Sequence, residues 1–286
     1  MQGERLIQTP PSEALPPTGE AKGGVRAIAT AIGNEVTKGL IDLWRGKIAS
    51  LLELILFALF FLAITFAVGR GTFHREQVTP LLLGFVGYIF FHMQTNRLFW
   101  GLLGEMQSGT LEQMYLSPLP SWLLTTGLEA AAVVEAAISA LLLSLFIDLV
   151  VQVTIPLRWA ALLPLALLVL GSVGYSLILG GLTLLFKRLE ILKEMFQVVV
   201  LIFGGVLVPL ERMPGWMAAI ARFLPLTPGI DVLRKTLLEG VSLGTLTGDG
   251  TLLWLVGNAA AYLALGIVIF RWCERIAKRR GTLGQY

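Results

Sequence analysis

The sequence is poor in the residues from which most enzyme sites are built. It has one cysteine, Cys273, and two histidines, His74 and His92, so we expect neither an internal disulfide nor a metal site. It contains no G-x-x-x-x-G-K-[ST] phosphate loop, and neither the H-E-x-x-H nor the G-x-S-x-G motif of hydrolases. We therefore expect no catalytic site and no cofactor bound by this chain.

Charged residues are also scarce, and this decides the class of protein. Asp, Glu, Lys and Arg make up 14% of the 286 residues, against 55% hydrophobic residues. With a mean hydropathy of +0.76, this composition predicts an all-α integral membrane protein that crosses the lipid bilayer several times. The net charge of +3 is too small to favour nucleic acid as a partner.

Six apolar stretches are long enough to cross a bilayer, which requires about 20 helical residues. They predict spans at about 48–68, 80–103, 123–151, 159–186, 191–209 and 251–272. These spans place residues 25–286 in a single transmembrane permease domain. The preceding residues 1–24 are rich in Pro, Glu and Gly, which predicts a disordered tail.

Three further stretches predict helices that do not cross the membrane. Residues 25–47 carry an apolar stripe of helical period interrupted by charges, which is typical of an amphipathic helix at the membrane interface. Residues 214–223 and 229–240 are apolar but too short to span, so we expect re-entrant or extracellular helices before the last span.

Polar residues lie inside two of the predicted spans. Five of the six residues from His92 to Arg97 are polar, which is unfavourable in lipid. They lie either near the membrane surface or on a polar wall of a translocation path or subunit contact. In the third span, we expect Glu129 at the interface and Glu135 deeper, where a carboxylate must be paired or neutral.

Small residues recur along the fourth predicted span. Ser172, Ser176 and Gly180 follow one another at intervals of four residues. This spacing lets another helix approach closely. The partner helix belongs either to the same subunit or to a second one.

The positive residues predict the orientation in the membrane. Lys187, Arg188 and Lys193 fill a short connection, and the strongest basic cluster follows the last span. With six spans both clusters fall on the same side, which the positive-inside rule makes cytoplasmic. We therefore expect a multi-pass protein of the cell membrane with both termini in the cytoplasm.

The stretch 104–122 separates the second and third spans and differs from both. Leu111, Met114 and Tyr115 are three and four positions apart, so they share one face of a short helix that Pro118 ends. Such a helix is either an ordinary interfacial loop or a projection that docks into a soluble partner.

Resemblance to a known family favours docking. Glu105, the run Ser-Gly-Thr-Leu-Glu-Gln at 108–113 and Ser-Pro-Leu-Pro at 117–120 resemble the signature of type-two permeases of ATP-binding-cassette (ABC) exporters. In that family this segment is similar to the coupling helix that sits on the ATPase subunit. The resemblance implies ATPase-coupling roles for Glu105, Gly109, Thr110, Leu111, Glu112, Met114, Tyr115 and Pro118.

The last third of the chain resembles the same family in the same order. Val-Pro-Leu at 208–210, Met-Pro-Gly-Trp-Met at 213–217 and Phe-Leu-Pro-Leu-Thr-Pro at 223–228 precede the last span. The resemblance implies an extracellular pair of short helices that gates the exit. The gate residues would be Pro209, Pro214, Trp216, Pro225 and Pro228.

The resemblance also implies partners and a mechanism. A permease of this size would pair with a separate ABC ATPase subunit, which carries the ATP and magnesium, and with a second permease copy or a paralogue. An amphipathic or lipidic cargo, such as a drug, a lipid or a lipid-linked glycan, would enter between the second and fifth spans. Candidate contacts are Phe85, Tyr88, Phe196 and Phe203, although these aromatic residues also suit lipid contact or packing.

A second reading is a secondary transporter driven by an ion gradient. Glu135 or His92 would then be the titrating group. Inverted repeats would favour this reading, and the two halves of the sequence show no clear self-similarity.

Overall fold

The computed structural model describes residues 25–110, 121–153, 155–156, 158–186 and 189–280. These residues form helices joined by short connections, and the described ranges contain no β-strand. The prediction of an all-α membrane protein is confirmed.

Five helices are long and apolar enough to cross a membrane. They are α2 (Lys47–Val68), α3 (Arg75–Gln107), α5 (Ser121–Val151), α6 (Leu162–Leu185, entered through the 3-10 turn Trp159–Ala161) and α11 (Thr251–Arg280). They correspond to the first four and the last of the predicted spans. Both α3 and α11 extend beyond the predicted ends, because polar residues continue the helix past the apolar stretch.

The predicted fifth span, 191–209, differs from the expectation. Its helix α7 (Glu190–Phe203) has only 14 residues, which gives about 21 Å at 1.5 Å per residue against a hydrocarbon core of about 30 Å. The helix stops at Gly204, and Gly205 adopts a left-handed φ of +73° that favours glycine. The structure therefore does not supply a sixth full-length span.

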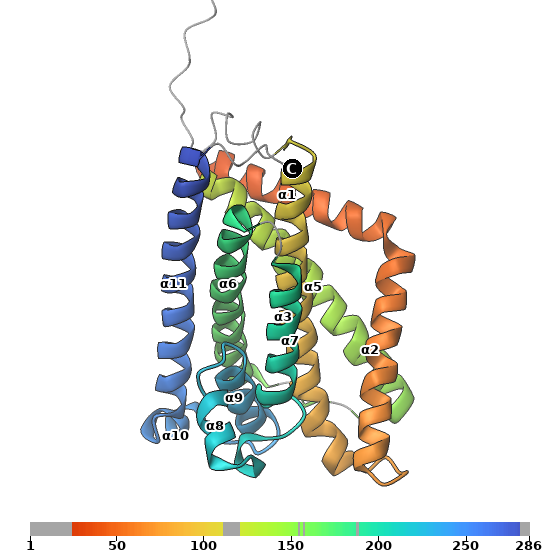
Figure 1. Ribbon diagram of the computed structural model, residues 1–286. Helices are drawn as coiled ribbons and strands as arrows, with labels where there is room; N and C mark the ends of the chain where they lie inside the picture. The colour runs from red at the N-terminus through yellow and green to blue at the C-terminus, as the bar shows by residue number, and fades with distance from the viewer. Residues whose placement is uncertain (1–24, 111–120, 154, 157, 187–188, 281–286) are drawn as a thin grey trace, which may run out of the picture.

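The helix α1 (Val25–Arg45) lies across one end of the bundle (Figure 1), which is called the α1 end below. It is packed against α5, and glycines allow the close approach: a Cβ atom on Gly39 would collide with the Glu135 carboxylate, and one on Gly127 would press on Glu35. The expected amphipathic helix before the first span is thus present.

Short helices occupy the opposite end of the bundle (Figure 1). They are the 3-10 turn Leu210–Arg212, α8 (Gly215–Ala221), α9 (Thr227–Leu237) and α10 (Leu243–Gly248). The helices α8 and α9 correspond to the two short helices predicted at 214–223 and 229–240.

Glycines bring α6 and α11 into backbone contact. A Cβ atom on Gly174 would overlap the backbone of Tyr262 and Leu263, and one on Gly266 would overlap the backbone of Gly174. The predicted stripe of Ser172, Ser176 and Gly180 faces other helices of the same chain. Gly180 lies against Leu98 and Leu102 of α3, and Ser176 bonds to α5.

Candidate functional site

Arg97 joins three helices through charged side chains near the α1 end. Its guanidinium lies 3.1 Å from the Asp42 carboxylate of α1 and 3.0 Å from the Glu135 carboxylate of α5. The polar run of α3 therefore faces neighbouring helices rather than the membrane surface. Glu135 is paired, as expected for a carboxylate in this position.

Glu129 lies in the interior, so its predicted place at the interface is wrong. Only 5% of the residue is exposed. One carboxylate oxygen accepts hydrogen bonds from the Ser176 hydroxyl of α6, at 2.7 Å, and from the Gln94 amide of α3. The side chain thus joins α3, α5 and α6 inside the bundle.

Lys193 is a buried residue of α7, so the prediction that it belongs to a basic connection is wrong. It is 0% exposed. Its ammonium donates to Asn96 at 2.5 Å, pairs with Glu194 at 2.8 Å, and lies 4.9 Å from the ring centre of Phe99. Hydrogen bonds and a cation–π contact are what a buried charge requires.

His92 connects this lysine to α2. Its Nε2 atom lies 2.9 Å from the Asn96 amide and 3.9 Å from the Glu53 carboxylate. The rings of Phe57 and Tyr88 have centroids 5.1 and 5.7 Å from that of His92. Together Glu53, His92, Asn96, Lys193 and Glu194 are called the α2–α7 polar cluster.

A second group of polar contacts holds the end of α3, where the predicted coupling segment begins. Lys38 of α1 pairs with Glu105 at 2.9 Å, and the Thr110 hydroxyl donates to the same carboxylate. The hydrogen bond to Glu105 raises the pKa of the Lys38 ammonium. Gly109 makes the turn after α3 with a left-handed φ of +70°. Lys38, Glu105 and Thr110 are called the stem cluster.

The stem cluster contains the part of the predicted coupling site that the structure describes. Glu105, Gly109 and Thr110 lie together at the end of α3. The other coupling residues, Leu111, Glu112, Met114, Tyr115 and Pro118, lie outside the described residues. Lys38 was not predicted from the sequence.

The four aromatic residues predicted to contact cargo make three separate contacts. Phe85 and Tyr88 are buried on α3, and the Phe85 ring lies 5.1 Å from Phe61 of α2. Phe196 stacks on Tyr175 of α6 at 4.7 Å. Phe203, at the end of α7, meets Trp216 at 6.3 Å. Of the four, Tyr88 lies beside the α2–α7 polar cluster.

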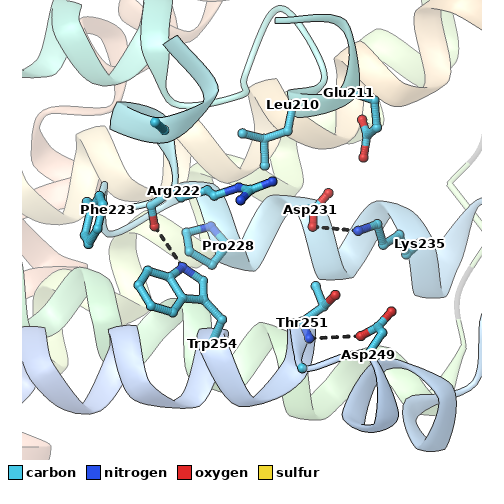
Figure 2. Close-up of a pocket in the computed structure, with 12 residues that line it drawn as sticks. Leu210, Glu211, Arg222, Phe223, Pro228, Asp231, Lys235, Asp249, Thr251 and Trp254 are labelled. Atoms are coloured by element: carbon cyan, nitrogen blue, oxygen red, sulfur yellow. Dashed lines mark hydrogen bonds and ion pairs between the residues drawn. The ribbon is translucent and has the colours of Figure 1, made fainter. Parts of the chain in front are cut away.

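The predicted gate residues surround the short helices at the opposite end. Pro209 and Pro214 precede the Leu210–Arg212 turn and α8, and the Trp216 side chain on α8 is exposed. The Pro225 carbonyl faces Gly171 of α6. Pro228 starts α9 and faces the cavity of Figure 2.

That cavity, of about 650 Å³, lies between the short helices and the start of α11. Figure 2 shows Glu211, Arg222 and Asp231 around it, and Asp231 pairs with Lys235 at 3.0 Å. Burial raises the pKa of Asp231 against the opposing effect of Lys235.

Arg234 fixes this end of the bundle and was not predicted as a site residue. Its guanidinium donates four hydrogen bonds of 2.6–3.0 Å to the carbonyl oxygens of Pro80, Gly205 and Val206. It thereby ties α9 to α3 and to the irregular backbone after α7. Burial lowers its pKa to about 10, so it stays charged at neutral pH.

The fold and the buried charges define a class of protein. A helical protein of this kind, with ionisable groups inside its bundle, is typical of membrane transport proteins. Residues 33–238 match the ABC-2 type transporter family, and the chain belongs to this family.

Relatives among well-described proteins agree with this assignment. The chain is 27% identical over 150 residues to the probable multidrug ABC transporter permease YbhR of Escherichia coli K12, and equally to YbhR of E. coli O157:H7. The match covers 49% of this chain and 38% of these relatives.

Proposed function

We propose that the chain is the membrane subunit of an ATP-driven exporter. It would act with a separate ABC ATPase, which binds ATP and magnesium, and with a second permease copy or a paralogue. The cargo would be amphipathic or lipidic and would leave the cytoplasm. We place the α1 end and both termini on the cytoplasmic side of the cell membrane. The proposal is supported by the family and by the word multidrug in the relatives' names.

The observation that carries the coupling role is the stem cluster. Lys38 connects α1 to the end of α3, next to the segment that resembles the coupling helix. Arg97 connects α1 to both α3 and α5, the two helices that flank this segment. A force applied to the segment would therefore reach α1, α3 and α5 together, which suits a two-state bundle driven by an ATPase.

The first experiment is a pull-down of the tagged chain from native membranes in mild detergent, followed by an ATPase assay. We expect a soluble ATPase to co-purify, and we expect Glu112→Arg to lose it while the permease still inserts. Purification of the chain alone, with transport that follows an ion gradient, would contradict the proposal and favour Glu135 or His92 as titrating groups.

A charge exchange tests the stem cluster. Lys38→Glu should reduce cargo-stimulated ATP hydrolysis at least about tenfold, because two carboxylates then repel each other beside the coupling segment. Adding Glu105→Lys should restore most of the activity. The pair is partly exposed, so its effect on stability should stay within about 1 kcal/mol.

The thermal unfolding temperature of each variant separates coupling from folding. Glu35→Lys, on the same helix, is the matched charge-reversal control. A double variant as inactive as Lys38→Glu alone would show that the ion pair has no role in coupling.

A further inference from the structure

The α2–α7 polar cluster exposes two carboxylates on the outside of the chain. The Glu53 side chain is 46% exposed and the Glu194 side chain is 56% exposed. The cation between them, Lys193, is 0% exposed and lies beneath the surface. The charge presented outward is therefore negative.

These carboxylates lie at the central depth of the bundle. Glu53 is 3.9 Å from His92, which lies near the middle of the 33-residue helix α3. At 1.5 Å per residue, His92 is more than about 20 Å from either end of this helix. Lys193, next to Glu194 in sequence, bonds to Asn96, one turn along α3 from His92. Both acids therefore lie near the middle of the membrane.

Carboxylates at this depth do not face lipid. An acidic side chain at the bilayer centre is unfavourable by about 2.5–3.5 kcal/mol or more, and such groups face protein or a water-filled path. If the second permease copy packs on this face by two-fold symmetry, it adds another Glu53 and Glu194 and increases the negative charge. The face therefore requires a cation from elsewhere.

Aromatic rings adjoin the carboxylates. Phe57 is half-buried beside His92, Tyr88 lies on the other side, and the charge of Glu194 acts on both Tyr88 and His92. Phe60, one turn along α2 from Phe57, is 43% exposed. Aromatic faces attract organic cations and also hold apolar groups.

We infer that this face recognises the positive charge of the cargo, and that the exported compounds are amphipathic organic cations. The charge would lie between Glu53 and Glu194, and the apolar part on Phe57, Phe60 and Tyr88. The inference rests on the proposed export function and specifies its substrate class. An anion of the same shape would be rejected, because it meets two carboxylates and a lysine already paired with Glu194.

The test uses two ions of nearly the same shape and opposite charge, tetraphenylphosphonium and tetraphenylborate. Binding of each is measured by equilibrium dialysis on the purified full chain in nanodiscs. We expect the unmodified chain to bind the phosphonium at least about tenfold more tightly. In the Glu53→Gln/Glu194→Gln variant this preference should disappear, because phosphonium binding weakens about tenfold or more while borate binding stays equal or improves.

The matched control removes two other exposed glutamates, Glu76→Gln/Glu190→Gln, at the starts of α3 and α7. It should leave the preference unchanged, and thermal unfolding shows that each variant folds. Equal binding of both ions by the unmodified chain, or unchanged phosphonium binding in the Glu53/Glu194 variant, would overturn the inference.

This assay needs no ATPase, so the two proposals fail separately. Charge-selective binding without a co-purifying ATPase would refute the coupled exporter and leave the cation site standing. A coupled ATPase stimulated equally by both ions would refute the cation site alone.

Discussion

Replacing Arg234 with leucine should destabilise the protein by about 3–5 kcal/mol. The substitution leaves the carbonyl oxygens of Pro80, Gly205 and Val206 without the guanidinium that now donates four hydrogen bonds to them. Unpaired carbonyls away from water are expensive, and removing a buried charge from its partners has effects of this size. Thermal unfolding in detergent measures the change.

Two further variants make the Arg234 result specific. Lysine is a point charge and cannot reach three carbonyls with the geometry of a guanidinium, so Arg234→Lys should retain only part of the stability. Arg212→Leu removes an exposed arginine at the same end of the bundle and should have an effect of about 0.5 kcal/mol or less. Unfolding of Arg234→Leu at the temperature of the unmodified chain would show that these hydrogen bonds make no net contribution.

Valine at Gly266 should prevent α6 and α11 from packing, with a loss of about 3 kcal/mol or more. Its Cβ atom would overlap the backbone of Gly174. A backbone cannot change rotamer to relieve the clash, so the helices must separate. We expect early aggregation in size-exclusion chromatography and a lower unfolding temperature.

Gly257→Val is the matched control on the same helix. A Cβ atom on Gly257 has no neighbour within 4 Å, so this variant should fold like the unmodified chain. Equal behaviour of the two variants would mean that α6 and α11 do not pack as closely as described.

Hydropathy and length predict most of the fold because five helices satisfy the bilayer individually. Each of α2, α3, α5, α6 and α11 has an apolar window of its own, and the predicted starts or ends lie within a few residues at most boundaries. The helix α7 has no such window. Its length depends on Gly204, Gly205 and the hydrogen bonds from Arg234, which connect residues far apart in sequence.

The missed site residues share a different cause. Lys193 follows Lys187 and Arg188, so its charge indicates a connection until the partner Asn96 is known. Glu129 is near the start of α5, and position along a helix was taken as depth in the membrane. Because α5 crosses between α3 and α6 there, its side chain meets Gln94 and Ser176 instead of water. Pairs that span 35 or 97 residues leave no local pattern.

The shortness of α7 has a consequence for how the protein is made. A helix of 14 residues that contains Lys193 and two glutamates is too short and too polar to be released into lipid by the translocon on its own. Its lysine has partners only after α3 is in place, and its last turn is secured only when Arg234 has been synthesised. Biogenesis of this protein therefore requires α7 to wait beside the translocon for helices on both sides of it in sequence. A ribosome-bound chain truncated before α9 should leave α7 accessible to water.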